Sequence, residues 1–410
     1  MKFFNVKSVE ETIQIINQHI HPIRETVVLP IDEALGFVLA EDVASGEAVP
    51  GFARSTVDGY AVKAKDTFGS SESLPGFLQV SGEIKMGEEA RGILMDGEAM
   101  YIPTGGMLPA GSDAVVMIEH CENLDGLLNV YHQVAPGENV IRKGEDVQEG
   151  ASLLVRGTRL RPQELGILAA VGITEITVYR KIRAGYISTG DEVVPYHTKQ
   201  LAVGQVRDIN QMTISSLIRE KGGEVLFGGI VNDRYDDFLE KAQEMYGKVD
   251  FLVMSGGSSV GTLDFTTEVI GSLGKPGILI HGVSIKPGKP TIFAVADGKP
   301  VFGLPGHPAS AMVIFKLFGE LILQRLSGEK SSNFPNRIQA RVSKNLPSDP
   351  GRSDYIRVRL ESREGEWWAN PVLGKSGLIS TMVMSDGMLE ISSEKEGVLE
   401  GEWVPVILFR

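Results

Sequence analysis

A regular alternation of strand-like and helix-like segments between about residues 181 and 326 restricts the fold more than any other feature of the sequence. Short apolar runs predict strands, and apolar residues three or four positions apart predict helices. Such alternation predicts a parallel-rich sheet with helices on both faces, whose ligands bind at the carboxyl ends of the strands. The expected strands are Ile182–Ser188, Val225–Phe227, Val249–Met254 and Val301–Leu304, and the expected helices are Gln211–Lys221, Tyr235–Tyr246 and Ala309–Leu326.

The rest of the chain is expected to form further domains, because 410 residues exceed one ordinary hydrophobic core. Ser8 and Glu11 have the spacing of a capping box before a first helix. A second helix is expected over Pro162–Ala170, between a proline start and a glycine end. Short apolar runs from Leu29 to Gly157 predict β-rich structure. A small β domain is predicted by four later runs: Ile338–Val342, Tyr355–Leu360, Trp367–Val372 and Val404–Phe409.

The composition of the chain excludes some classes of function. A net charge of -13 argues against a general nucleic-acid binder, although a local cluster of cations could still bind an anion. With Cys121 as the single cysteine, no disulfide forms within the chain. Lys316 and Glu320 interrupt the most apolar stretch, and the first residues reach charge too early for a secretory signal. We therefore expect no membrane contact and a cytoplasmic location.

The glycine- and serine-rich segment Ser255–Gly261 follows an expected buried strand directly. Its composition is typical of an anion-binding nest at the start of a helix, and a plain glycine-rich turn is an equal alternative. Asp264 lies three residues further on, where a carboxylate beside an anion suits a bridging Mg²⁺. A simple helix cap is the alternative for Asp264.

Two further loops carry candidate residues. Lys286 and Lys289 lie three apart on a loop stiffened by prolines and a glycine, so an anion could neutralise both, although surface lysine pairs are common. His307 lies in the loop Gly303–Pro308, and a structural role for it is favoured over acid–base catalysis. Asp191 and Glu192 follow another expected strand, where they suit a metal, an amine or an ordinary capped turn.

Seven segments in order resemble one family. They are STVDGYAV, IPTGG, STGDEVV, GQVRDIN, SGGSSVGTLDFT, IKPGKPT and FGLPGHPAS. These are similar to the signatures of MoeA and the gephyrin E-domain, the molybdopterin molybdenumtransferases. The resemblance covers essentially the whole chain.

The resemblance implies an α/β plus β fold with several domains and an elongated homodimer. Family members join molybdate to the dithiolene of adenylylated molybdopterin and release AMP, assisted by Mg²⁺, and a transient contact with the molybdopterin adenylyltransferase is expected. The expected domains are an N-terminal helix at 1–27, a linker subdomain at 28–45 and 146–173, a β-rich subdomain at 46–145, a molybdopterin-binding α/β domain at 174–330, and a β-barrel-like domain at 331–410.

The resemblance also implies roles for individual residues. Asp58 and Thr104 are expected to reach the site from the other subunit, and Asp233 and Asp264 to hold Mg²⁺ during adenylate cleavage. The catalytic set is then Asp58, Thr104, Glu192, Asp233 and Asp264. The set that binds substrate and oxyanion is Ser255, Gly256, Gly257, Ser258, Lys286, Lys289, Arg357 and Ser376.

The sequence departs from the family pattern at a few positions. His307 stands where relatives often have Asn, Ser258-Ser259 replaces a more usual Val-Ser pair, and Asn232 precedes Asp233 where many relatives carry an acid. A catalytically silent paralogue that serves as a scaffold is the main alternative function. A nucleotide pyrophosphatase or nicotinamide-nucleotide deamidase is less favoured because of the flanking β regions. The sequence does not distinguish molybdate from tungstate.

Overall fold

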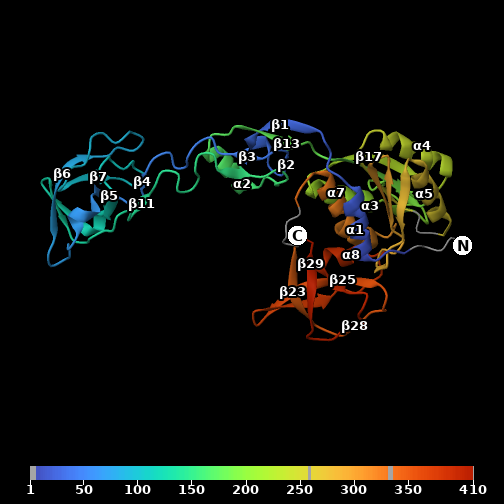
Figure 1. Ribbon diagram of the computed structural model, residues 1–410. Coiled ribbons are helices and arrows are strands. Elements are labelled where there is room, and N and C mark those ends of the chain that lie inside the picture. The colour runs from blue at the N-terminus through green and yellow to red at the C-terminus, as the bar shows by residue number, and fades with distance from the viewer. Residues whose placement is uncertain (1–5, 257–259, 331–335, 410) are drawn as a thin grey trace.

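The computed structural model describes residues 6–256, 260–330 and 336–409, and within 257–265 it describes no side chains. The chain is elongated (Figure 1). A β-rich subdomain lies at one end, a small mixed subdomain lies in the middle, and an α/β domain with a β barrel beneath it lies at the other end. No helix among the described residues is long and apolar enough to cross a membrane.

The α/β domain is built on a six-stranded sheet of order β17-β14-β18-β22-β21-β19. The first four strands are parallel, as the alternation predicted. The last two pairings, of β22 with β21 and of β21 with β19, are antiparallel and were not anticipated. A two-residue hairpin turn of Asp297 and Gly298, both with positive φ, joins β21 to β22. The strands are β14 (Arg183–Thr189), β17 (Glu224–Val231), β18 (Phe251–Ser255), β19 (Pro276–His281), β21 (Ile292–Ala296) and β22 (Lys299–Leu304).

Helices cover both faces of this sheet, so its central strands are buried on both sides. On β18, Phe251 and Val253 join one hydrophobic cluster, whereas Leu252 and Met254 join the other. The capping box of Ser8 and Glu11 is present at the start of α1. The described helices of this layer are α1 (Val9–His19), α3 (Asn210–Glu220), α4 (Tyr235–Tyr246), α5 (Val260–Ser272), α6 (Pro308–Ile314) and α7 (Glu320–Leu326).

The expected long helix Ala309–Leu326 is not regular. A π-helical segment, Phe315–Gly319, separates α6 from α7. A Cβ at Gly319 would lie 2.5 Å from the ring of Phe315, so the segment accommodates this ring only because residue 319 has no side chain. The helix still begins at Pro308, directly after the loop that carries His307.

The middle subdomain and the distal β-rich subdomain together form the elongated part of the molecule, which we call the arm. The middle one combines a three-stranded sheet with α2 (Pro162–Ala170), which matches its predicted bounds. Its strands are β1 (Thr26–Pro30), β2 (Val38–Leu39) and β13 (Glu175–Tyr179). The distal one is a six-stranded sheet of β5 (Gly59–Val62), β6 (Gly76–Glu83), β7 (Glu98–Ile102), β8 (Ala114–Met117), β9 (Cys121–Leu124) and β10 (Leu127–Val130).

The C-terminal region is a closed five-stranded barrel, which confirms the barrel-like prediction. Pairing of β25 with both β26 and β27 closes it. A further short strand, β20 (Ile285–Lys286), comes from the α/β domain and pairs with the start of β25. The barrel strands are β23 (Arg337–Val342), β25 (Ser353–Arg363), β26 (Glu366–Pro371), β27 (Gly387–Ile391) and β29 (Trp403–Leu408).

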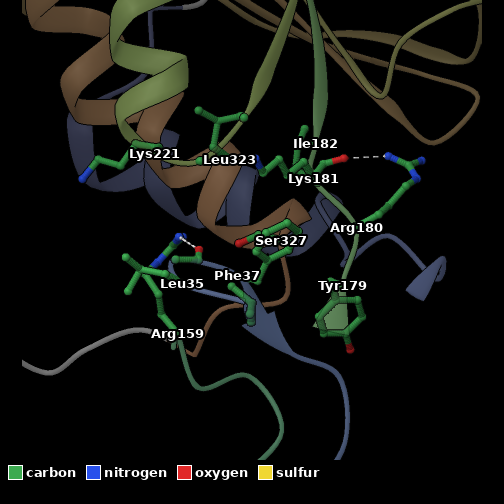
Figure 2. A pocket seen from close by; sticks show the side chains of 14 residues that line it. Leu35, Phe37, Arg159, Tyr179, Arg180, Lys181, Ile182, Lys221, Leu323 and Ser327 are labelled. Atoms are coloured by element: carbon green, nitrogen blue, oxygen red, sulfur yellow. Dashed lines mark hydrogen bonds between the residues drawn. The ribbon is translucent and has the colours of Figure 1, made fainter. Parts of the chain in front are cut away.

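Figure 2 shows a small cavity of about 120 Å³ at the junction between the middle subdomain and the α/β domain. Its cations are already engaged. Arg159 donates to the carbonyl of Gly36 at 2.6 Å and pairs with Glu329 at 2.7 Å. Lys181 lies over the ring of Phe37, with its ammonium 5.1 Å from the centroid. We therefore interpret the cavity as a structural contact between subdomains.

Candidate functional site

Four parallel strands end at one cavity of about 410 Å³. Ser188 and Thr189 come from the end of β14, Ser255 from the end of β18, and Asp233 and His307 from the segments that follow β17 and β22. This is the edge at which the sequence predicted a ligand. We call it the acidic cavity, because its other ionisable lining residues include Glu192 and Asp208.

A hydrogen-bonded network forms the floor of the acidic cavity. The Asn210 amide donates to the Ser255 hydroxyl at 2.7 Å and to the carbonyl of Gly306 at 2.8 Å. Ser188 donates to the carboxylate of Asp208, which also accepts from the backbone N–H of Gln211 at 2.9 Å. Because buried polar groups with fixed partners hold one geometry, the strand ends have little freedom to move.

The first glycine of the predicted nest, Gly256, lies so close to Thr189 that no other residue fits there. Gly256 has a φ of +144°, and a Cβ there would lie 2.0 Å from Oγ1 and 2.4 Å from the carbonyl oxygen of Thr189. No side chain fits such a space. Ser255 and Gly256 line the acidic cavity, whereas Gly257 and Ser258 lie outside the described residues.

A second cavity, of about 550 Å³, adjoins the first. Lys286, Lys289 and Ser376 line it together, so the structure brings these three predicted residues to one place. Arg352 also lines it, and its guanidinium pairs with the buried carboxylate of Asp354 at 3.0 Å. We call this the basic cavity. Its cations can bind a multiply charged oxyanion.

The lysine loop is held rigidly, as its prolines and glycine predicted. The Lys289 carbonyl accepts from the backbone N–H groups of Val283 at 3.0 Å and Thr291 at 2.9 Å. Lys286 continues strand β20, opposite Asp354, and its ammonium lies 3.9 Å from that carboxylate. Gly288 has a φ of +113°, and a Cβ there would lie 2.4 Å from Ile314. Both ammonium groups are therefore presented by fixed backbone.

His307 lies between the two cavities and lines both of them. Its Nδ1 is 3.0 Å from the hydroxyl oxygen of Ser376. A backbone bond from the Ala309 N–H to the Ser376 carbonyl, at 3.1 Å, ties the same two segments together. His307 is therefore common to the linings of the two cavities, which we together call the cleft.

Arg357 lies on β25, three residues beyond Asp354, which pairs with Lys286. It is 6% exposed and is not among the residues that line either cavity. Its guanidinium donates to the carbonyl of Gly374 at 2.8 Å, and its Nε has no partner among the described residues. Burial lowers the pKa of Arg357. Through this hydrogen bond to Gly374, the guanidinium holds the loop that carries Ser376.

Asp58 and Thr104 lie next to strands β5 and β7 of the distal β-rich subdomain. This subdomain lies at the opposite end of the molecule from the α/β domain (Figure 1). The two residues are hydrogen-bonded to each other. The Asp58 carboxylate accepts from the backbone N–H of Thr104 at 2.7 Å and from its hydroxyl at 2.9 Å. These bonds hold the pKa of Asp58 below its ordinary value. Within one chain these two residues form a separate exposed pair.

Asp233 lies close to other carboxylates in the acidic cavity. Burial, and then the neighbouring carboxylates of Asp191 and Glu192, raise the pKa of Asp233 above its ordinary value. A bound divalent cation would relieve this crowding of like charge. Within the described residues, no group of three or more acidic, histidine or cysteine side chains could hold a metal. The side chain of Asp264 lies outside that part of the chain.

Sequence reasoning missed three residues of the cleft: Asp208, Asn210 and Arg352. Asp208 and Asn210 lie in the segment GQVRDIN, at the start of a helix. Polar side chains at that position could have indicated hydrogen-bonding groups at the base of the cavity. No local pattern singles out Arg352. Cys121 lies in the distal subdomain, and burial raises its pKa to about 12, so this thiol is unreactive at neutral pH.

Comparison with known proteins shows which family the chain resembles. Three family models match in order: the MoeA N-terminal region (domain I and II) over residues 7–172, a probable molybdopterin binding domain over 185–325, and the MoeA C-terminal region (domain IV) over 339–409. The fold and the matched regions thus define a molybdenum-cofactor biosynthesis protein.

Individual relatives agree with these matches. A putative molybdopterin biosynthesis protein of Methanocaldococcus jannaschii is 33% identical over 99% of this chain and 98% of its own. The molybdopterin molybdenumtransferase of Haemophilus influenzae is 34% identical over 93% of each chain. The crystal structure of a MoeA protein from Pyrococcus horikoshii superposes with a TM-score of 0.85 at 30% identity, covering 99% of this chain and 100% of that one. The chain belongs to the MoeA family, the molybdopterin molybdenumtransferases.

Proposed function

We propose that the protein transfers molybdate to the dithiolene of adenylylated molybdopterin and releases AMP. Its relatives are named molybdopterin molybdenumtransferases, which supports the transfer of molybdenum to molybdopterin. The observation that carries the proposal is the adjoining pair of cavities. One is lined by Lys286, Lys289 and Ser376, and the other by strand-end residues, including Ser255 and Gly256, that suit a phosphorylated ligand.

The residues act mainly by electrostatics. Lys286 and Lys289 concentrate the oxyanion, and Ser376 adds a hydroxyl donor, in a cleft partly shielded from water. The thiolates that attack belong to the substrate, which suits a chain whose one thiol, on Cys121, is unreactive. Arg357 acts through the loop it supports at Gly374.

Mg²⁺ belongs to the proposal. Asp233 would hold it, together with Asp264, and Glu192 would add negative potential nearby. Mg²⁺ commonly takes one or two carboxylates, with substrate phosphate and water completing its shell, so a protein site with few ligands suits it. When bound, the cation would stabilise charge on the phosphates as AMP leaves.

A homodimer is also part of the proposal. Asp58 and Thr104 belong to the distal subdomain, which lies at the opposite end of the molecule from the α/β domain (Figure 1), so they would act in the cleft of a second copy. A transient contact with the molybdopterin adenylyltransferase, a cytoplasmic location and the predicted domain limits remain expectations.

The direct test incubates the purified protein with adenylylated molybdopterin, Mg²⁺ and molybdate, and measures AMP. Release of AMP that requires molybdate is expected. No release would favour the silent scaffold instead. Parallel reactions with tungstate establish which oxyanion the protein uses, because the two ions have similar size and charge.

A further inference from the structure

We propose that Arg352 is a third cation that binds the oxyanion in the basic cavity, beside Lys286 and Lys289, and this inference rests on the proposed function. Arg352 directly precedes strand β25 of the barrel, whereas both lysines belong to a loop of the α/β domain. No carboxylate among the described residues lines this cavity. An oxyanion there would therefore meet cations from two parts of the molecule and no negatively charged side chain.

The backbone that carries Arg352 is tied to the lysine loop. The N–H of Ser353 donates to the carbonyl of Ser284 at 3.0 Å, and the Ser284 hydroxyl donates to the carbonyl of Gly351. These two hydrogen bonds flank Arg352 in the sequence. Ser284 directly precedes β20, which ends at Lys286. The backbone of Arg352 is therefore fixed beside the strand that presents the first lysine.

The carboxylate of Asp354 holds the side chain of Arg352. Asp354 is 2% exposed, and its Oδ1 accepts from Nε of Arg352 at 3.0 Å. Its Oδ2 lies 3.9 Å from the ammonium of Lys286, so one carboxylate contacts both cations. A bond at Nε leaves the two terminal nitrogens of the guanidinium for other partners. One of them, Nη2, pairs with Asp349, and Nη1 has no hydrogen-bond partner in the described part of the chain.

The balance of charge favours an anionic ligand. The lining contributes three cations, and Asp354 is the one buried carboxylate that pairs with any of them within the described ranges. Two positive charges therefore remain without a buried partner, and molybdate carries two negative charges. Asp349 offsets little of this excess, because its side chain is 75% exposed and exposed ion pairs are weak.

The guanidinium of Arg352 also adds geometry to this charge. Its planar fork can donate two parallel hydrogen bonds to neighbouring oxygens of an oxyanion, whereas a lysine ammonium acts as a point charge. Arg352 also neutralises Asp354, and a lysine at position 352 would still do so. Arg352→Lys therefore separates oxyanion binding from the structural ion pair.

The test measures the dissociation constant of radiolabelled molybdate by equilibrium dialysis. Arg352→Lys should bind molybdate about tenfold more weakly than the wild type, because the fork is lost. Its Tm should be nearly unchanged, because a cation remains beside Asp354. Arg352→Ala also loses the charge, so its affinity should fall further, about 30-fold or more.

Arg359→Ala is the matched control. Arg359 lies on β25, is exposed and lines neither cavity, so its removal changes the net charge of the barrel by the same amount as Arg352→Ala. Its molybdate affinity should equal that of the wild type. An equal loss of affinity in Arg359→Ala would overturn the inference, because net charge alone would then explain the effect.

The remaining outcomes separate the role of Arg352 from the proposed function. Wild-type affinity in Arg352→Lys would assign Arg352 to neutralising Asp354 and overturn the inference, and so would a wild type that binds no molybdate. Weak binding together with a large fall in the Tm of Arg352→Lys would also count against it. The proposed function has a separate readout, the molybdate-dependent release of AMP by the wild type. If AMP is released while Arg352→Lys binds molybdate normally, the role of Arg352 alone is refuted.

Discussion

Substitution of Gly256 by Ala tests whether the close contact between strand ends β14 and β18 shapes the acidic cavity. The added Cβ would lie 2.0 Å and 2.4 Å from two oxygens of Thr189, where ordinary contacts are at least 3.4 Å, so the strand ends must separate by about 1 Å. Overpacking costs about 1–3 kcal/mol. A side chain in backbone space reserved for glycine adds about 1–3 kcal/mol.

The expected total, about 2–6 kcal/mol, corresponds to a fall in Tm on the order of 10 °C for a domain of this size. Calorimetry or far-ultraviolet circular dichroism measures it. Tryptophan fluorescence would report another domain, because Trp367, Trp368 and Trp403 all lie in barrel strands. AMP release should fall as well, because the backbone that faces the substrate is displaced.

Gly271→Ala is the matched control. Gly271 lies in helix α5 of the same domain, and a Cβ there would meet nothing within 4 Å. Alanine favours helix, so this variant should be as stable as the wild type or more stable by up to about 1 kcal/mol. Equal melting temperatures for the two variants would show that the contact at Thr189 does not constrain the domain.

Three further substitutions test the cleft. Lys286→Ala should raise the molybdate concentration for half-maximal AMP release about tenfold and leave the Tm nearly unchanged, since an exposed loop lysine adds little to a core; equal losses of stability and activity would contradict this. Asp233→Asn should raise the Tm at neutral pH. The folded state raises the pKa of this carboxyl, so the wild type loses folding free energy as the pH rises from the unfolded-state pKa through the folded-state pKa. The gain should vanish at lower pH, and Mg²⁺ should stabilise the wild type but not the variant; equal stabilisation of both would exclude Asp233 as a ligand. Arg357→Met should lower turnover at least about tenfold with little loss of stability, because no carboxylate among the described residues pairs with this buried cation. A large loss of stability with normal turnover would assign Arg357 to the fold alone.

The helical spacing of apolar residues predicted the helices that bury one regular apolar face. Helix α4 has its predicted bounds, and α3 differs by one residue at each end. Strands β19 and β21 were missed because their runs were read as an irregular stretch, although Asp297-Gly298 is a recognisable hairpin turn. Closure of the barrel depends on pairing between distant strands, which no local pattern encodes.

The site was predictable where residues follow strands or share one loop. Lys286 and Lys289 line one cavity because a short loop carries both. The positions of Arg352 and Arg357 depend on how the barrel packs against the α/β domain, so the sequence could not distinguish a cavity-lining arginine from a buried one. The roles of all these residues stay predictions.

Strand β20 gives the cleft a mechanical property. It belongs to the α/β domain by sequence but is hydrogen-bonded to the barrel, through Ile285 opposite Ser353 and Lys286 opposite Asp354. The lysine loop is therefore hydrogen-bonded on two sides, to the barrel through β20 and to the α/β domain through the Lys289 carbonyl. A rotation of the barrel against the α/β domain would strain both sets of bonds at once, so the loop should resist such a rotation and keep its two ammonium groups at a fixed place between the two units.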